Sequence, residues 1–294
     1  MCRLLCQKTS DLLYVYNVPV PPNLYPTMLA NVGDMTNKGI ELVITGELIK
    51  SENFRWSATA NFAHNKNMIT KLSNDLYSTQ RIFTGLVNLR GSGYLTSSVI
   101  EEGQEVGTFY NLKYKRIDEN GKFEIEDINK DGTINNDDYT YIGHALPRFT
   151  YGIQNTLSYK KIDLTFFLRG IYGNDVLNSP RIQYSNSKWL PGGNVLAEAL
   201  TNGVKQDPLF SSYYIEKGSF LRLDNASLAY NFDLKNLWGI NKFRVYLSGQ
   251  NLFCITKFKG LDPEVNMSGL SPGVMETFYV PKSRTVSFGL EINF

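Results

Sequence analysis

Apolar and polar residues alternate with a period of two along much of the chain. The last segment is the most regular, with Val286, Phe288, Leu290, Ile292 and Phe294 alternating with Ser287, Gly289, Glu291 and Asn293. The same alternation is clear at 54–64, 149–159 and 162–169. It is less regular at 38–49, 92–101, 107–117, 219–232 and 242–253. This period is typical of strands with two unlike faces, so the pattern predicts roughly nine strands, each close to the ~9–11 residues that a tilted strand needs to cross a bilayer.

The connections between these segments alternate in length. Short links are predicted at 50–53, 102–106, 159–161 and 233–241, and long ones at 70–91, 118–148, 171–218 and 254–283. Membrane barrels have short turns on the periplasmic side and long loops outside, whereas a soluble sandwich has no reason to sort its loops in this way. If Phe294 closes the last strand in the periplasm, all the long loops are extracellular.

Composition agrees with a barrel. Aromatic residues make up 13% of the chain, with 18 Tyr and 17 Phe, and many stand at the ends of the predicted strands, where membrane barrels carry aromatic girdles. No apolar run reaches the ~18 residues of a transmembrane helix. We therefore predict an all-β, antiparallel transmembrane β-barrel. The near balance of 30 Lys plus Arg against 28 Asp plus Glu gives no basic surface for nucleic acid.

Several motifs resemble those of SusC/RagA-type TonB-dependent transporters. They are, in chain order, Asn31-Val32-Gly33-Asp34 with Asn37-Lys38-Gly39-Ile40-Glu41-Leu42, Pro147-Arg148-Phe149-Thr150-Tyr151-Gly152, Phe166-Phe167-Leu168-Arg169-Gly170 with Tyr172-Gly173-Asn174-Asp175, Phe220-Leu221-Arg222-Leu223-Asp224-Asn225, and Gly249-Gln250-Asn251-Leu252. Their order makes the resemblance specific. It covers residues 11–294, while residues 1–10 are expected to be an N-terminal stub outside the family pattern.

The resemblance implies the C-terminal part of a 22-stranded outer-membrane barrel. Such proteins carry an N-terminal plug, bind the TonB complex, pair with a SusD-like surface lipoprotein, and import oligosaccharides or peptides, of which we favour a glycan here. A signal peptide, a plug and a TonB-binding motif are not found in this sequence, and roughly half of the strands are present. As a truncated barrel fragment the chain is expected to be inactive alone, because an open sheet leaves strand edges unpaired in lipid. A chain without function of its own is compatible with this interpretation.

One loop has the spacing of a calcium site. Residues 127–138 read DINKDGTINNDD, which fits an EF-hand-like loop with oxygen ligands at positions one, three, five, seven and twelve. The predicted ligands are Asp127, Asn129, Asp131, the carbonyl of Thr133, and Asp138. Gly132 would make the sharp turn and Ile134 would pack beneath. The alternative is a polar hairpin of Asx-turns that binds no ion.

The longest loop, 171–218, carries Tyr184, Trp189, Tyr213 and Tyr214. Aromatic rings on an extracellular loop suit stacking on a sugar or contact with a lid protein. They are equally suited to packing the loop against itself.

Catalysis finds little support, because the two histidines, His64 and His144, are far apart in sequence and no nucleophile or phosphate-loop motif appears. We predict that the chain is not an enzyme. The leading hypothesis is therefore uptake of a large nutrient across the bacterial outer membrane. The alternative is a secreted, calcium-stabilised, carbohydrate-binding β-protein, whose apolar faces would be buried and which would need no detergent.

Overall fold

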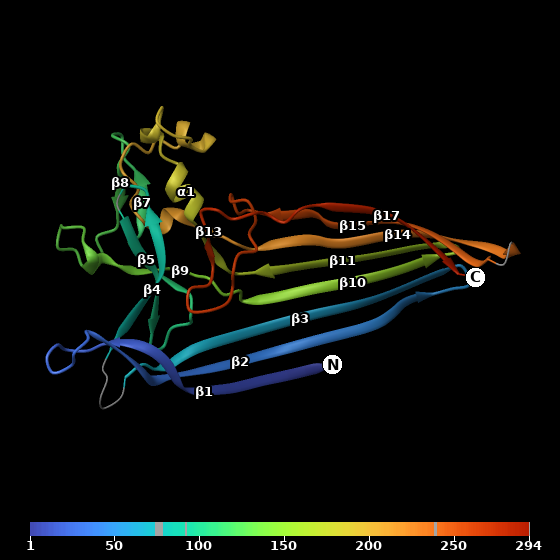
Figure 1. The fold of residues 1–294 in the computed structure, drawn as a ribbon, viewed down its shortest axis with the longest axis horizontal. Helices are drawn as coiled ribbons and strands as arrows, with labels where there is room; N and C mark the ends of the chain where they lie inside the picture. The colour runs from blue at the N-terminus through green and yellow to red at the C-terminus, as the bar shows by residue number, and fades with distance from the viewer. Residues whose placement is uncertain (74–78, 92, 238–239, 294) are drawn as a thin grey trace.

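A computed structural model describes residues 1–73, 79–91, 93–237 and 240–293, and its main feature is a sheet of eight long antiparallel strands (Figure 1). We call this sheet the wall. Its spatial order is β1-β2-β3-β10-β11-β14-β15-β17. The strands are β1 (Cys2–Asn17), β2 (Thr27–Lys50), β3 (Phe54–Lys71), β10 (Phe149–Tyr159), β11 (Ile162–Tyr172), β14 (Phe220–Leu237), β15 (Ile240–Thr256) and β17 (Thr285–Asn293).

The strand register aligns like residues across the wall. One row of directly paired residues consists of Ile49, Trp56, Leu157, Leu164, Leu228, Leu247 and Phe288. The neighbouring row consists of Glu47, Ser57, Thr156, Thr165, Ser227, Ser248 and Ser287. Because successive side chains of a strand point to opposite faces, the wall has an apolar face and a polar face. The apolar face is open to the surroundings, since Leu228, Leu247 and Phe288 are 51%, 51% and 68% exposed.

The remaining elements gather at one end of the wall, on the left of Figure 1, and we call them the loop layer. It contains the sheet β4-β5-β6-β9, the sheet β13-β12-β16 and the hairpin β7-β8. Their bounds are β4 (Arg81–Leu89), β5 (Gly93–Glu101), β6 (Thr108–Asn111), β7 (Tyr114–Ile117), β8 (Phe123–Ile125), β9 (Thr140–His144), β12 (Asp175–Asn178), β13 (Ile215–Lys217) and β16 (Val274–Met275). The helix α1 (Ser179–Tyr184) and the 3-10 turns η1 (Asn136–Asp138), η2 (Ser187–Trp189), η3 (Ala197–Leu200) and η4 (Ser212–Tyr214) complete it.

The loop layer has the main buried core of the described residues. Phe109, Leu177 and Ile182 are fully buried there, and Phe210 and Tyr214 are 1% exposed. This core joins segments that are far apart in sequence, because β6, β12, α1 and η4 all contribute to it. The loops that follow β3 and β11 therefore fold into one packed unit.

Two of the predicted wall strands belong to this unit instead. Within the predicted segment 92–101, residues 93–101 form β5, and segment 107–117 contains β6 and β7, so the predictions that each crosses a membrane are wrong. Residues 72–148 are thus a single excursion between β3 and β10, and the link 102–106 is a turn within the loop layer. Period two could not reveal this, since a short strand half-buried on a loop core alternates as a barrel strand does.

The first wall strand was not recognised from the sequence. Residues 2–10, expected to be a stub, form the first half of β1 and pair with β2 from Cys2↔Leu42 to Thr9↔Met35. The alternation of β1 is broken by register shifts between Thr9 and Leu13, which hides the strand from a period-two search.

The short links that join wall strands agree with the prediction. Residues 51–53 and 160–161 connect paired strands at the end of the wall opposite the loop layer, where the C-terminus also lies (Figure 1). Phe294, predicted to close the last strand, lies outside the described residues, as does part of the link 233–241. In the described part of the chain no helix has the length and apolar character to cross a membrane.

Candidate functional site

The predicted calcium loop is a set of Asx-turns in which side-chain oxygens accept backbone N–H groups. Asp127 accepts hydrogen bonds from the amides of Lys130 (2.6 Å) and Gly132 (2.9 Å). Asp131 accepts one from the amide of Thr133 at 2.7 Å, and Asn129 accepts one from the amide of Asp131 at 3.1 Å. Gly132 has a φ of +85°, a left-handed conformation that favours glycine. The turn at Gly132 is therefore confirmed, and these hydrogen bonds hold its oxygen-bearing side chains together.

Asp138, the twelfth position, ties the two ends of this loop together. Its carboxylate accepts hydrogen bonds from the amides of Asn135 (2.9 Å) and Ile128 (2.8 Å), and the residue is fully buried. These backbone donors, with that of Asn135 the strongest, hold the pKa of Asp138 below its usual value. Ile134, expected beneath the loop, is instead 44% exposed.

Calcium binding by residues 127–138 stays a prediction. No group of three or more His, Cys, Asp or Glu residues in the described ranges is arranged to hold a metal ion. Two of the predicted ligands, the side-chain oxygen of Asn129 and the backbone carbonyl of Thr133, do not belong to these four residue types. Calcium loops commonly use oxygens of both kinds.

The four aromatic residues of loop 171–218 divide into two pairs. Tyr214 belongs to the loop-layer core, and Tyr213 packs against it, with their rings 5.0 Å apart. Phe123 contacts both, at 5.0 Å from Tyr213 and 6.1 Å from Tyr214. The guanidinium of Arg181 lies 4.8 Å from the centre of the Tyr213 ring. Burial raises the pKa of Tyr214. For this pair the alternative left open by the sequence, packing of the loop against itself, is what the structure shows.

Tyr184 and Trp189 are partly exposed, and both rings lie near the guanidinium of Arg90. The guanidinium of Arg90 lies 4.3 Å from the Trp189 ring centre and 5.9 Å from that of Tyr184. Arg90 follows β4, so this cluster joins the excursion 72–148 to loop 171–218. Contact of these two aromatic rings with a substrate or a partner protein stays a prediction.

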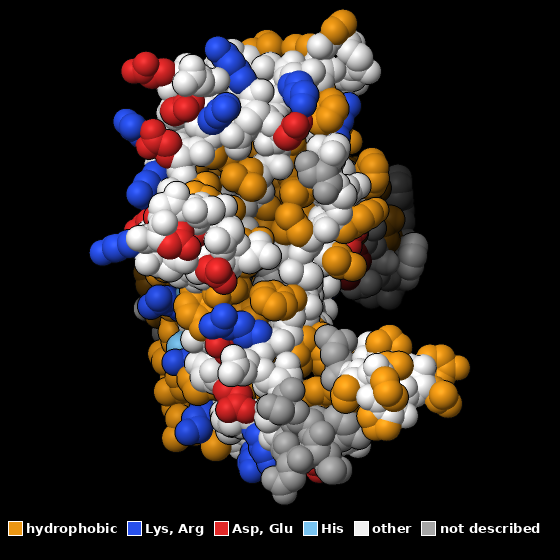
Figure 2. Space-filling view, turned by 90° about the vertical axis from the view of Figure 1, so that its left-hand side faces the viewer, with side chains coloured by type: hydrophobic (Ala, Val, Ile, Leu, Met, Phe, Trp, Pro, Cys, Tyr) orange, Lys and Arg blue, Asp and Glu red, His pale blue; other side chains and the backbone are white. Residues whose placement is uncertain are grey.

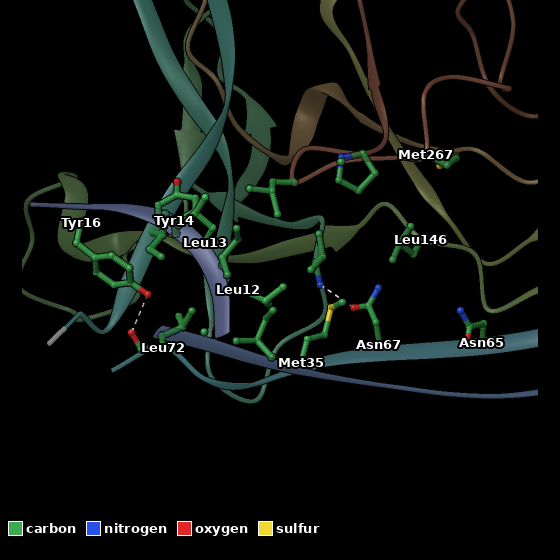
Figure 3. Close-up of a pocket in the computed structure, with 18 residues that line it drawn as sticks. Leu12, Leu13, Tyr14, Tyr16, Met35, Asn65, Asn67, Leu72, Leu146 and Met267 are labelled. Carbon is green, nitrogen blue, oxygen red and sulfur yellow. Dashed lines mark hydrogen bonds between the residues drawn. The ribbon is translucent and has the colours of Figure 1, made fainter. Parts of the chain in front are cut away.

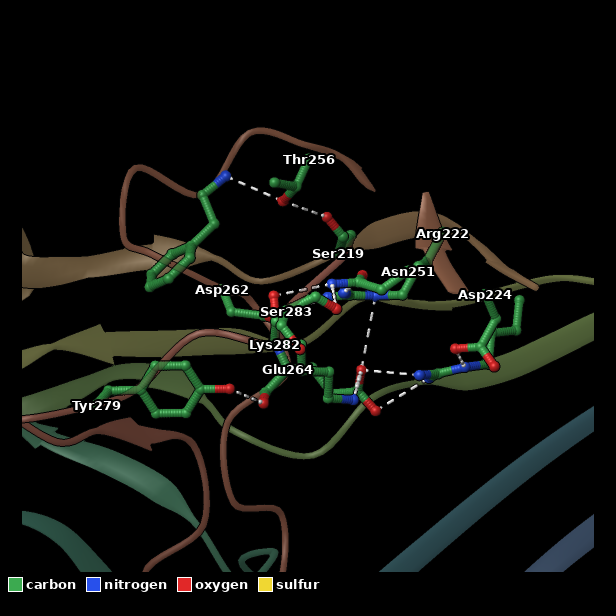
Figure 4. A network of polar contacts seen from close by, with 12 residues as sticks. Ser219, Arg222, Asp224, Asn251, Thr256, Asp262, Glu264, Tyr279, Lys282 and Ser283 are labelled. Carbon is green, nitrogen blue, oxygen red and sulfur yellow. Dashed lines mark hydrogen bonds and ion pairs between the residues drawn. The ribbon is translucent and has the colours of Figure 1, made fainter. Parts of the chain in front are cut away.

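A network of charges that the sequence analysis missed lies where the wall meets the loop layer (Figure 4). Arg169 of β11 and Arg222 of β14 are direct cross-strand partners on the polar face. Two like charges placed opposite each other destabilise a sheet. Acidic groups compensate them: Arg222 pairs with Asp262 at 2.6 Å, while Arg169 binds Glu264 through two nitrogens, at 3.0 and 2.9 Å.

Both of these acids lie on residues 257–284, which we call the strap. The C-terminal end of the strap is also held. Lys282 pairs with Glu264 of the same strap at 2.6 Å. The side-chain amide of Asn251, on β15, donates to the carbonyls of Lys282 and Ser283. Arg169 further pairs with Asp224 at 2.8 Å, so three cations face three carboxylates. The network thus fixes the strap to three wall strands at once.

Glu264 is central to the network and remains ionised. Burial raises its pKa, but hydrogen bonds from Arg169 and Lys282 outweigh the burial and hold the pKa below its usual value. The sequence does carry one signal for this site. Two successive wall strands each have an arginine, Arg169 or Arg222, on the polar face near the loop layer. The acids of the strap could not have been paired with them from sequence.

A second feature that the sequence analysis missed is an apolar cavity of about 440 Å³ (Figure 3). It lies among β1, β2, β3, the first strands of the loop layer, and the strap, which contributes Met267, Gly269, Leu270 and Pro272. Three lining residues, Met35, Asn67 and Ile69, lie on the polar face of the wall. Elsewhere on this face, β2 and β3 carry mainly polar residues. No periodic pattern marks such a cavity.

The loop end of the molecule also exposes apolar side chains. Figure 2 looks onto this end and shows apolar patches among charged groups. On the connection between β1 and β2, Val20, Leu24 and Tyr25 are 56%, 92% and 75% exposed. Exposed apolar groups that adjoin one another are typical of protein-binding surfaces.

Each of the two histidines contacts a backbone carbonyl. His64 contacts the carbonyl of Arg148 through Nδ1, and His144 contacts that of Leu146 at 3.0 Å. Both rings therefore contact carbonyls of the short segment that leads into β10.

Comparison with known proteins gives relatives of one kind, TonB-dependent receptors. No family model matches the chain. It is 31% identical to TonB-dependent receptor P26 of Formosa agariphila and 28% identical to receptor P3 of the same organism, in each case over 98% of the chain. It is 32% identical to TonB-dependent receptor SusC of Bacteroides thetaiotaomicron, also over 98% of the chain. These matches cover 32%, 31% and 29% of the relatives, so the chain spans about a third of their length.

Solved structures agree with the sequence matches. The RagAB peptide transporter superimposes with a TM-score of 0.78 at 27% identity, covering 98% of this chain and 32% of that one. The RagAB peptide importer in its closed-closed state gives a TM-score of 0.76 at 26% identity, covering 100% and 33%. The relatives are receptors and transporters by name, in agreement with a protein that is not an enzyme. The strand order, the two-faced wall and these similarities together identify the chain as the C-terminal part of a SusC/RagA-type TonB-dependent receptor barrel.

Proposed function

We propose that the chain forms part of an outer-membrane channel that imports a large nutrient, an oligosaccharide or a peptide. The observation that carries the proposal is the pair of neighbouring rows, one apolar and one polar, that crosses seven wall strands. An apolar face that stays exposed suits lipid, and a polar face suits a water-filled lumen. The barrel wall would then separate the bilayer from the path of the nutrient.

The loop layer suits the extracellular side of such a channel. It is a folded unit at one end of the wall, and it is connected to the polar face by the strap. We propose that a SusD-like lipoprotein covers this end and that the exposed apolar connection between β1 and β2 contributes to the contact. Energy from the TonB complex would reach the barrel through parts of the protein that precede these strands.

A secreted carbohydrate-binding protein is the weaker candidate. A soluble protein rarely exposes a continuous apolar surface of many side chains, and Leu247, Phe253, Ile255, Phe288 and Leu290 are all between 43% and 68% exposed. No observation favours this candidate over the import channel.

The test is fractionation followed by uptake. In cells that express the complete gene with an epitope tag on an extracellular loop, we expect the protein in the outer-membrane fraction, resistant to extraction by alkaline carbonate. Deletion of the gene should abolish uptake of labelled malto-oligosaccharides or short peptides supplied as the only carbon source, and reintroduction should restore it. A protein that is recovered in the soluble secreted fraction would overturn the proposal.

A further inference from the structure

The apolar cavity has the position of a cargo subsite. The wall supplies Leu12 and Tyr14 from β1, Met35 from β2, and Asn67 and Ile69 from β3. Leu146 and Met267 lie across the cavity from these strands (Figure 3), and Leu270 also lines it. Met35, Asn67 and Ile69 lie on the polar face, which lines the lumen in the proposed function. The cavity is therefore adjacent to the space through which cargo would pass.

The base of the cavity is a packed cluster and keeps its shape without a ligand. Ile69, Leu72, Ile100 and Val106 are 2%, 4%, 3% and 7% exposed and form one buried group, against which Met35 and Ile82 pack. Since packed side chains resist collapse, the volume of about 440 Å³ is preformed. Such a volume is within the range of sites for small ligands.

Two polar atoms of the lining are already bonded to the protein. The side-chain oxygen of Asn67 accepts the amide of Val106 at 2.9 Å, and the hydroxyl of Tyr16 donates to the carbonyl of Leu72 at 3.2 Å. A sugar placed here would bury hydroxyl groups against aliphatic side chains with few partners, which is unfavourable. An aliphatic or aromatic group placed here would leave only water behind, and the removal of apolar surface from water is favourable.

We propose that this cavity binds an apolar side chain of a peptide cargo, with residues 267–272 of the strap as its outer wall. The inference rests on the proposed import function and narrows the cargo class, because a glycan does not suit the lining. The peptide backbone on either side of the bound residue stays in the lumen, where water satisfies its amides. Residues 267–272 are held in place through the strap, whose Asp262 and Glu264 are paired with Arg222 and Arg169.

The experiment compares two peptides and one sugar on the complete, detergent-solubilised protein. The probes are the pentapeptide Ala-Ala-Phe-Ala-Ala, the same peptide with Ser in place of Phe, and maltopentaose, with binding measured by titration calorimetry. We expect the Phe peptide to bind about 10-fold more tightly than the Ser peptide, as burial of one aromatic side chain predicts. Maltopentaose should not compete with it.

Two variants fill the cavity from the strap, Leu270→Trp and Met267→Trp. Leu270 is 47% exposed, so its replacement spares the buried cluster. The matched control is Leu261→Trp on the same strap, because Leu261 is 63% exposed and does not line the cavity. We expect both filling variants to reduce the preference for Phe over Ser to less than 2-fold, and the control to keep it.

The outcomes separate this inference from the proposed function. If the peptides bind and are imported but the preference is absent, or is unchanged in both filling variants, the cavity does not bind the side chain and the import function stands. Tight competition by maltopentaose at the same site would overturn the assignment to a peptide. If cells take up neither peptide nor sugar through the wild-type protein, the proposed function itself fails.

Discussion

In the wall, Leu247 and Phe288 are 51% and 68% exposed, whereas in the loop layer Phe109 and Phe210 are 0% and 1% exposed. The same kinds of side chain are thus directed outward in one region and inward in the other. The difference follows from the solvent: a sheet in a bilayer gains nothing by hiding its apolar face, whereas a unit in water is stabilised mainly by doing so. An apolar side chain should therefore be needed for contact with lipid in the wall and for internal packing in the loop layer.

The largest effect is expected from a cavity in the loop layer. Phe109→Ala should lower the free energy of unfolding of this layer by about 3–5 kcal/mol, because a fully buried ring is removed. Pulsed proteolysis of the outer-membrane protein should then cut the loop layer and leave the wall strands protected. The control is Phe83→Ala in β4 of the same sheet, where the ring is 48% exposed and the loss should be well below half as large.

A charge on the apolar face of the wall should come next. Leu247→Arg, in the middle of β15, should lower the free energy of unfolding in vesicles by about 2–4 kcal/mol, because the guanidinium enters hydrocarbon. The neighbouring change Ser248→Arg points to the polar face and should cost little. Denaturant titrations followed by the heat-modifiable gel shift of the barrel would measure both. Equal losses from the two changes would contradict the assignment of the faces.

The strap is the point where the two regions meet, and acid should detach it from the wall. The folded pKa of Glu264 is below its unfolded value, so the stabilisation that it gives is complete above the unfolded value of about 4.3 and is lost as the pH falls through the folded pKa. Hydrogen exchange of residues 257–284 should therefore be constant from about pH 7 to pH 5 and accelerate below about pH 4, after correction for intrinsic rates.

Glu264→Gln should give fast exchange in the strap at every pH, because the carboxylate that Arg169 and Lys282 share on the strap is lost. Glu276→Gln is the matched change at an exposed position of the same strap, and it should leave the exchange unchanged. A strap that loosens equally in both variants would show that the ion pairs do not hold it.

The smallest effect concerns the loop of residues 127–138. If it binds calcium with the weak affinity usual outside cells, about 1 mM Ca²⁺ should stabilise it by about 1 kcal/mol. Asp131→Asn should abolish this gain, whereas Asp137→Asn, outside the predicted ligand set, should keep it. Loop protection from proteolysis with and without a chelator, with Mg²⁺ as the control ion, would measure the difference. Equal protection in all samples would leave the loop as a hairpin of Asx-turns.

The sequence predicted the wall far better than the loop layer. For β10, β11 and β17 the alternation assigned each residue to a face, since a strand's faces depend only on its own period. It missed β1, where register shifts interrupt the alternation, and it placed β5 and β6 in the wall. For the candidate sites, the turn of the 127–138 loop was predictable because its Asx-turns are local. The packing of Tyr213 and Tyr214 on the loop-layer core was not, because the partner Phe123 is distant in sequence.

What the sequence determined by itself is local: which residues alternate, where glycine and Asx-turns bend the chain, and the order of family motifs. Only the tertiary structure decided which short strands leave the wall, which acids of the strap neutralise Arg169 and Arg222, and that a cavity opens among β1, β2 and β3. The physical reason is that these features arise from contacts between segments many residues apart. A period of two specifies that a strand has two faces, but not which solvent, sheet or strap each face will meet.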